Sequence, residues 1–159
     1  MFRIGDLAVY PAHGVGKIES LETKNIGGKK QDFYIMRILD NDMKILIPIN
    51  NAGAVGLRQL IGSDDVPRVY GILQSREVSV NGGTWNRRYR EYMEKIKTGS
   101  IYELAEVLRD LTVLKGDKEL SFGERKMLDT ARGLLLKELS IVREISEEEI
   151  DQEIRDILK

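Results

Sequence analysis

The hydrophobic residues of this chain change their spacing near residue 60, and this change limits the folds open to it. Before residue 60, short runs of aliphatic and aromatic residues alternate with turn residues, a pattern that predicts strands. After Ser63 the apolar residues recur every three or four positions, which predicts amphipathic helices. We therefore expect an α+β chain, with an N-terminal Tudor/SH3-like small β-barrel over residues 1–60 and a compact C-terminal bundle of about five helices over residues 61–159.

The predicted strands are separated by clusters of Gly, Pro, Asn and Asp that suit tight turns. We expect strands at Leu7–Tyr10, Val15–Ile18, Phe33–Leu39 and Lys44–Pro48. Because proline cannot donate a ladder hydrogen bond, Pro48 favours an edge or an end for the last strand. Gly14–Lys17 resembles a phosphate-binding loop, but Pro11 and Ile18 stand where that motif needs glycine and a hydroxyl residue. We interpret it as a hairpin turn.

The predicted helices carry apolar stripes and stop signals. The stripes are Val66, Val69, Tyr70 and Leu73, then Leu104, Val107, Leu108 and Leu111, then Leu128, Ala131, Leu134, Leu135 and Leu139. Gly99 and Gly116 stand where helix ends are expected, since glycine adopts the left-handed conformation of a C-terminal cap without strain.

The composition indicates a globular chain and excludes several kinds of site. Of 159 residues, 42% are hydrophobic and 32% are charged. No long apolar run or leader is visible, so we expect a cytoplasmic protein that meets no membrane. Without cysteine, and with His13 as the single histidine, the chain lacks the usual zinc ligands. We see no nucleophile motif, and we expect no catalytic residue, no metal, no cofactor and no small-molecule substrate.

One predicted helix begins with the wrong charge. Acidic side chains near a helix N-terminus stabilise the helix, and the other four predicted helices have such residues. One of these helices begins Ser63–Asp65, and the other three begin with the predicted capping boxes Ser100/Glu103, Ser121/Glu124 and Ser146/Glu149. Thr84 is suited to cap the remaining helix, but Arg87 takes the place of the glutamate. A local rule that is broken at one helix indicates a functional site, here one that meets an external anion such as phosphate.

Trp85, the only tryptophan, opens this cationic helix and leaves two interpretations open. It can be a core anchor at the head of the stripe Tyr89, Tyr92, Met93 and Ile96. It can instead be an exposed wedge, because it follows Gly82–Gly83 and is flanked by arginines, as in proteins that distort a base step in the minor groove.

The charges are unevenly distributed along a chain whose net charge is -1. The segment from Trp85 to Lys97 is basic, and the segment after Glu144 is strongly acidic. Such a chain should bind nucleic acid weakly by itself, and usefully only when a partner delivers it.

Several motifs in register resemble the CarD/CdnL family of bacterial transcription regulators, in its short CdnL-type form. The resemblance lies in Gly5–Gly14, Thr84–Ile96, Ala105–Leu111 and Leu120–Leu128, and it runs to about residue 143. It implies a Tudor-like domain that binds the RNA polymerase β subunit and a helical domain that touches promoter DNA. Together they would stabilise the open promoter complex, on the nucleoid and with the protein as a monomer.

The resemblance also implies roles for individual residues. Trp85 matches the family tryptophan that enters the minor groove at the upstream edge of the melted bubble. DNA-contacting basic positions match Arg87, Arg88, Arg90, Arg125 and Lys126, and polymerase contacts match Lys24, Met36, Leu46 and Pro48. Some members carry arginine where this chain has Leu46, which points to an apolar rather than an ionic contact.

An alternative keeps the polymerase-binding barrel but changes the role of the helices. The protein would be an adaptor whose Trp85 helix recruits another protein, since Trp and Arg are also enriched in protein–protein hot spots.

Overall fold

The structure is a computed structural model that describes residues 1–77, 84–115 and 119–159. Residue contacts divide the chain into two units, Met1–Leu60 and Ile61–Lys159, at the point where the hydrophobic spacing changes. Gly82, Gly83 and Gly116, which the sequence analysis singled out, lie outside the described residues.

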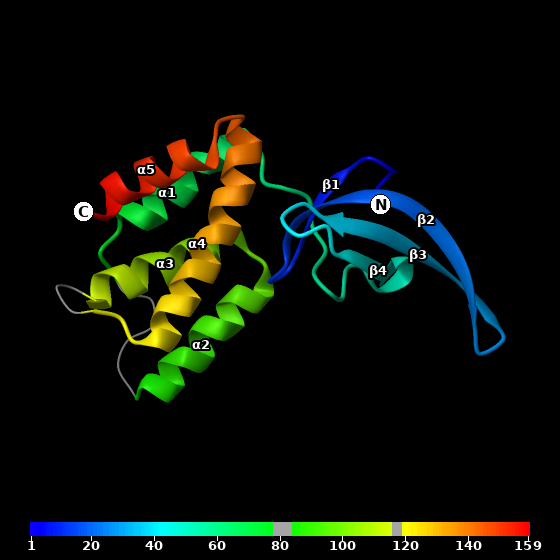
Figure 1. Cartoon of the computed structure of the whole chain (residues 1–159), viewed down its shortest axis with the longest axis horizontal. Coiled ribbons are helices and arrows are strands. Elements are labelled where there is room, and N and C mark those ends of the chain that lie inside the picture. The colour runs from blue at the N-terminus through cyan, green and yellow to red at the C-terminus, as the bar shows by residue number, and fades with distance from the viewer. Residues whose placement is uncertain (78–83, 116–118) are drawn as a thin grey trace. The chain divides into compact units, whose positions relative to one another are not determined.

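The first unit is a curled antiparallel sheet of four strands in sequence order, a Tudor-like half-barrel as predicted (Figure 1). The strands are β1 (Leu7–Tyr10), β2 (Gly14–Ile26), β3 (Lys29–Ile38) and β4 (Lys44–Pro48). The core of the sheet consists of Ala8, Ile18, Tyr34, Met36, Ile38, Ile47 and Leu57. The outer side of β1 is bridged by Arg58, which exchanges two backbone hydrogen bonds with Val9. β4 pairs with β3 alone and is an edge strand, as Pro48 indicated.

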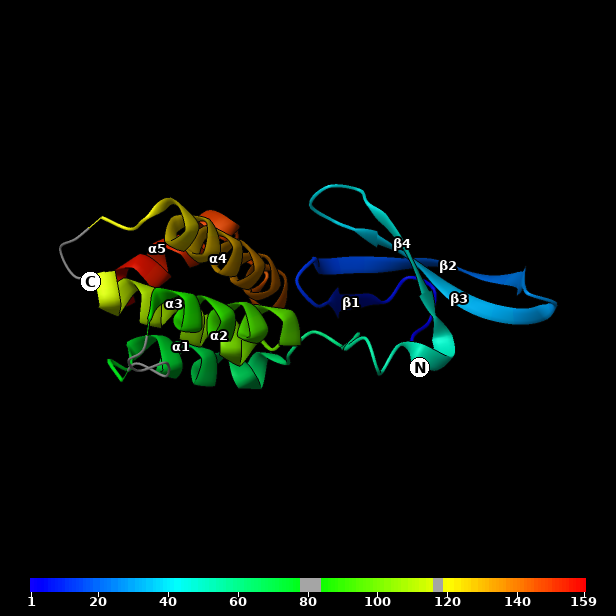
Figure 2. The same ribbon diagram turned by 90° about the horizontal axis from the view of Figure 1, so that it is seen from below.

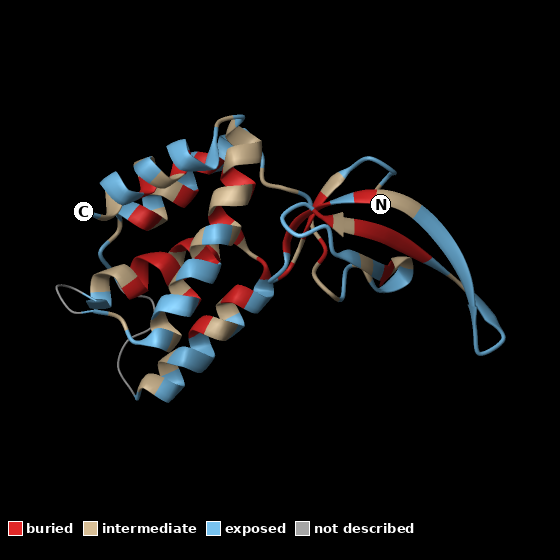
Figure 3. Cartoon of the chain, in the orientation of Figure 1, coloured by how far each residue is buried: buried red, intermediate tan, exposed pale blue. Residues whose placement is uncertain are grey.

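Strands β2 and β3 continue past the sheet core as a long ribbon, which Figure 2 shows from the side. Gly27 and Gly28 turn the ribbon with φ angles of +58° and +82°, values that glycine adopts without strain. The far half of β2, from Leu21 to Ile26, is exposed throughout (Figure 3).

Gly16, near the start of β2, allows close packing against β3. A Cβ atom on Gly16 would lie 2.6 Å from Cε of Met36 and 2.7 Å from the carbonyl oxygen of Arg37. Glycine is therefore required here for the close approach of β3, in keeping with the hairpin interpretation.

The second unit consists of five α-helices in the described residues, as predicted. They are α1 (Val66–Gln74), α2 (Trp85–Thr98), α3 (Ile101–Lys115), α4 (Phe122–Arg143) and α5 (Glu147–Leu158). A short 3-10 turn at Ser63–Asp65 precedes α1, and another at Ile49–Asn51 follows β4 in the first unit. Helix α3 packs against α1, α2 and α4, and α5 packs on α1 and α4 (Figures 1 and 2).

The predicted apolar stripes form two neighbouring cores around α3. One core joins α1, α3, α4 and α5 through residues such as Val69, Leu108, Leu139 and Ile150. The other joins α2, α3 and α4 through Tyr92, Ile96, Val107 and Ala131, among others. Helix α2, with its cationic start, is thus anchored by its second half.

The helix termini follow the predicted signals in part. Helix α1 begins at Val66, after a 3-10 turn at Ser63–Asp65, and only the serine half of the predicted box at Ser146 forms. Gly99 ends α2 in the left-handed conformation, Ser121 and Glu124 form a complete capping box, and the Ser146 hydroxyl accepts the Glu149 N–H. At α3 the box is rearranged: the Thr98 hydroxyl accepts the Ser100 N–H and contacts the Glu103 carboxylate itself. Thr98 thus takes the place of the Ser100 side chain, which was expected to pair with Glu103 directly.

Candidate nucleic-acid interface

The start of α2 has the inverted charge that the sequence predicts. The hydroxyl of Thr84 accepts the backbone N–H of Arg87 at 3.4 Å, and the first turn contains no acid. The first turns of α4 and α5, by contrast, contain Glu124 and Glu147–Glu149. The unpaired N–H groups of α2 therefore add to the positive charge of its arginines.

The cations near this start differ in how they are held. Arg87 is exposed and pairs along the helix with Glu91 at 3.4 Å, a contact of little energetic weight. Arg90 is exposed and has no acidic partner among the described residues. Arg88 is half-buried, and its Nε atom is covered from solvent without a hydrogen-bond partner in the described chain.

Trp85 is half-buried and belongs to none of the hydrophobic cores of the described residues. Its ring meets the Tyr89 ring edge-on with 5.7 Å between centroids, and the guanidinium of Arg88 lies 5.7 Å from its centroid. A Cβ atom on Gly123 would lie 4.0 Å from Cζ2 of the indole. The indole therefore lies against the first turn of α4, at the rim of the bundle rather than inside it.

The first turns of α4 bring further cations and a second aromatic ring to this rim. Arg125 and Lys126 are exposed and have no acidic partner among the described residues. Phe122 is 83% exposed, and it borders a hollow of about 370 Å³ that Arg125, Lys126, Asp129 and Thr130 also line. We call the surface formed by Trp85, Arg87, Arg90, Phe122, Arg125 and Lys126 the cationic rim.

Sequence reasoning missed Phe122, although a signal was present. Phe122 precedes the apolar stripe of α4 but is out of phase with it, because Leu128, Ala131 and Leu135 lie on the opposite side of the helix. A large apolar residue that is out of phase with the core stripe is a candidate contact residue.

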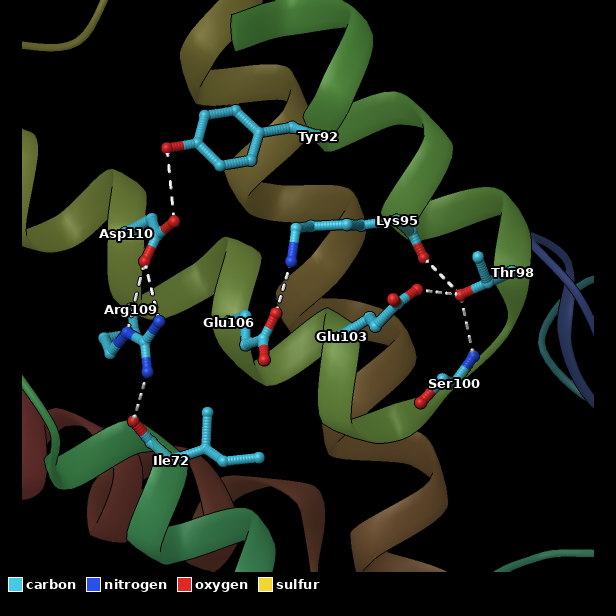
Figure 4. Close-up of polar contacts among 9 residues, drawn as sticks. All are labelled: Ile72, Tyr92, Lys95, Thr98, Ser100, Glu103, Glu106, Arg109 and Asp110. Atoms are coloured by element: carbon cyan, nitrogen blue, oxygen red, sulfur yellow. Dashed lines mark hydrogen bonds and ion pairs between the residues drawn. The ribbon is translucent and has the colours of Figure 1, made fainter. Parts of the chain in front are cut away.

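Three polar contacts fix α2 on α3 below the rim (Figure 4). The Tyr92 hydroxyl donates to Asp110 at 3.4 Å, Lys95 pairs with Glu106, and Thr98 contacts Glu103. Burial raises the pKa of Tyr92 well above its ordinary value, so the phenol stays a neutral donor. These contacts hold α2, which contributes part of the cationic rim, in a defined position on α3.

A buried ion pair extends this network to α1. The guanidinium of Arg109 donates to the Asp110 carboxylate at 3.0 and 3.1 Å, and to the carbonyl oxygen of Ile72 at 3.2 Å (Figure 4). Arg109 is 6% and Asp110 0% exposed. Because the charges are paired and hydrogen-bonded, their burial is tolerated, and loss of one partner would be costly.

The residues that match polymerase contacts lie on the sheet unit. Leu46 is 43% exposed on β4, opposite Ile35, and the half-buried Pro48 lies opposite Phe33. Lys24 is exposed on the ribbon, opposite Gln31. Leu46, Pro48 and their partners share one side of the sheet, which is the side away from its core.

Met36 does not fit the role that the resemblance implied. Its side chain is 0% exposed, and it packs in the sheet core against Gly16. β3 is also a central strand, so β2 and β4 already pair with its backbone. Its neighbour Ile35 lies on the side of Leu46 by the alternation of β3, and it is itself 6% exposed.

No described helix has both the length and the apolar character needed to cross a membrane. Within residues 1–77, 84–115 and 119–159, no cluster of three His, Asp or Glu side chains has the arrangement of a metal site.

Sequence models of known protein families match both units of the chain. A family model described as "CarD, C-terminal domain" matches residues 68–155, and one described as "CarD-like/TRCF RID domain" matches residues 2–61. The chain is 39% identical over 150 residues to the "Putative transcription factor YdeB" of Bacillus subtilis (strain 168), covering 94% of this chain and 97% of that protein.

Two solved structures match part of the chain in sequence. The CdnLNt structure from Myxococcus xanthus is 51% identical and covers 38% of this chain and 86% of that chain, with a TM-score of 0.34. The solution structure of the 72-residue N-terminal domain of Myxococcus xanthus CarD is 29% identical and covers 37% and 79%, with a TM-score of 0.33.

The fold and the rim define a two-unit α+β protein whose helical part presents free cations and aromatic rings. The family models and the relative from Bacillus subtilis identify it further: the chain belongs to the CarD family of transcription regulators. This is a family of transcription factors rather than of enzymes.

Proposed function

We propose that this protein regulates transcription initiation in the cytoplasm: its sheet unit binds the β subunit of RNA polymerase, and its helical unit stabilises the open promoter complex. The observation that carries the proposal is the cationic rim, where Arg90, Arg125 and Lys126 are exposed without acidic partners among the described residues, and Trp85 and Phe122 lie at the adjacent starts of α2 and α4. No nucleotide hydrolysis is needed, because differential binding to melted and closed DNA is sufficient to shift their equilibrium.

On the DNA side, Trp85 enters the minor groove at the upstream edge of the bubble. Its location outside the cores leaves the ring available, and an apolar wedge between flanking cations suits a distorted base step. Arg87, Arg90, Arg125 and Lys126 contact phosphates. Such contacts are individually weak at physiological salt, which agrees with a net charge of -1 and with delivery by a partner.

On the polymerase side, β4 offers an edge strand for pairing with a strand of the β subunit. Leu46 and Pro48 supply an apolar contact beside Ile35, and Lys24 supplies a cation further along the ribbon. Tethering through this sheet raises the local concentration of the rim at the promoter, so a weak DNA contact becomes effective.

The lifetime of the open complex on a promoter, measured over a salt series, tests the DNA contacts. Replacing Arg90 or Lys126 by alanine should reduce the salt slope by about one unit, since each phosphate contact contributes about that much. Lys97→Ala is a matched control, because Lys97 is exposed at the other end of α2. If the control lowers the slope as much as Arg90→Ala, the rim is not the DNA-binding surface.

Retention of polymerase on the immobilised protein tests the sheet contact. Leu46→Glu should abolish retention, because it places a charge in a desolvated contact. Lys44→Glu is a control on the same side of the same edge strand, since Lys44 is already charged and exposed and pairs with Glu19, so its replacement removes no apolar contact. Normal retention by a folded Leu46→Glu variant would contradict this assignment of β4.

One observation favours a second candidate, the adaptor function. Phe122 is 83% exposed beside a hollow, and exposed aromatic and arginine side chains also mark protein-binding hot spots. Crosslinking from position 122 in the promoter complex distinguishes the two: adducts to DNA support the wedge function, and adducts to protein alone support the adaptor.

A further inference from the structure

Arg88 differs from the arginines on either side of it in sequence. The side chain of Arg87 is 68% exposed and Arg90 is exposed as well, whereas Arg88 is half-buried. The Nε atom of Arg88 is covered from solvent and has no hydrogen-bond partner among the described residues. That edge of the guanidinium is therefore unavailable for the bidentate grip through which arginine binds phosphate.

The guanidinium of Arg88 faces an aromatic ring instead. Its central carbon lies 5.7 Å from the centroid of Trp85, within the range of a cation–π interaction. Positions 85, 88 and 92 are neighbours on one face of α2, and the charge of Arg88 is also close enough to lower the pKa of Tyr92 slightly against the effect of burial. Arg88 thus lies between the indole and the anchored part of the helix.

Among the described residues, three groups support the indole. Arg88 lies over the ring, Tyr89 meets it edge-on at an interplanar angle of 66°, and Gly123 of α4 lies beside its Cζ2 atom. Since Tyr92 is fully buried, the base of this arrangement is fixed in the bundle. A ring held in this way loses less conformational freedom when it binds.

We propose that Arg88 is a positioning residue, which holds the Trp85 indole against the first turn of α4 and contributes no phosphate contact. The proposal rests on the wedge function of Trp85. It divides the arginines of α2 into two roles: Arg87 and Arg90 bind the DNA backbone, and Arg88 pre-organises the wedge.

Two measurements separate a positioning role from a phosphate contact. Because Trp85 is the only tryptophan, all indole emission comes from this ring, and quenching by neutral acrylamide reports its exposure in the free protein. The salt dependence of the open-complex lifetime counts phosphate contacts. The variants are Arg88→Met, which keeps an apolar stem, and Arg88→Lys, which keeps the charge but loses the planar group.

Arg88→Met should make the indole more accessible to acrylamide and shorten the open-complex lifetime, while the salt slope stays unchanged. Arg88→Lys should show the same changes to a smaller extent. The matched control, Arg90→Met, should leave acrylamide quenching unchanged and reduce the salt slope by about one unit.

A double-mutant cycle with Trp85→Ala completes the test. If Arg88 acts through the ring, Arg88→Met should cause no further loss of lifetime in the Trp85→Ala background, whereas Arg90→Met should. An unchanged quenching constant, or a salt slope that falls by about one unit in Arg88→Met, would overturn the proposal. If Trp85→Ala leaves the lifetime unchanged, the wedge function itself fails, and the quenching measurement still decides whether Arg88 holds the ring.

Discussion

Replacing Trp85 by alanine should lower the stability of the fold only slightly but shorten the lifetime of the open promoter complex strongly. The contacts of the ring in the structure give the expected loss in the free energy of unfolding. Beyond the apolar area that the half-buried ring covers, the edge-on pair with Tyr89 is worth about 0.5–1.5 kcal/mol and the guanidinium of Arg88 about 0.5–1 kcal/mol, so the loss of these two contacts in Trp85→Ala should lower the free energy of unfolding by about 1–2.5 kcal/mol. Because the ring lies outside the cores, truncation leaves no internal cavity to add to this loss.

Urea unfolding followed by far-ultraviolet circular dichroism measures this loss. Tyr92→Ala provides the comparison on the same helix, because its fully buried ring should cost about 3–5 kcal/mol. The open-complex lifetime of Trp85→Ala should fall by about 5- to 150-fold, the range of a coupling of about 1–3 kcal/mol.

Two results would refute this reasoning about Trp85. A loss of stability as large as that of Tyr92→Ala would identify the indole as a core anchor. An unchanged open-complex lifetime in a folded Trp85→Ala variant would remove the ring from the mechanism.

Three further predictions concern stability. Gly16→Ala should destabilise the sheet unit by about 1–3 kcal/mol in urea unfolding, because its Cβ would lie 2.6 Å from Cε of Met36; a stability equal to wild type would show that β3 can move away. Gly123→Ala should stabilise the helical unit by up to about 1 kcal/mol, since the methyl group would meet the indole at an ordinary contact distance of 4.0 Å; a loss would mean that the indole is displaced. Arg132 holds the pKa of Asp151 below its ordinary value, so the stability from this pair is present at neutral pH and is lost as the pH falls through the lowered pKa. Wild type should therefore lose more stability than Asp151→Asn between about pH 5 and pH 3, and equal losses would contradict the pairing.

The sequence predicted the cores better than it predicted the ends of the strands. β1 and β4 have the predicted bounds because their residues lie against the sheet core. β2 and β3 extend to Ile26 and from Lys29, well beyond the predicted runs. Their outer halves are mostly polar and exposed, and the two apolar residues there, Leu21 and Ile26, do not alternate, so no pattern marks these halves as strands. Pairing between the two strands maintains them.

Individual surface residues were harder to predict than elements. The alternation along β3 was visible in sequence, but which side faced the core depended on the pairing of Ile18 with Met36, and this pairing buries Met36. The position of Trp85 at the rim likewise depended on α4, because contact with Gly123 joins residues that are far apart in the chain. Such facts come from tertiary contacts, which local spacing does not encode.

The sequence left the role of the acidic last helix, α5, open. In the structure, acidic side chains of α5 form ion pairs with basic side chains of α4. Arg132 pairs with Asp151 at 2.5 Å, Lys137 with Glu147 at 3.3 Å, and Arg143 with Glu153.

These pairs neutralise the later part of α4, whereas Arg125 and Lys126 in its first turns have no acidic partner among the described residues. The free positive charge of α4 is thereby confined to the end that adjoins the start of α2. Within the described part of α4, this arrangement would favour the rim for the DNA contact that we propose, since paired cations release few counterions on binding and attract phosphate weakly.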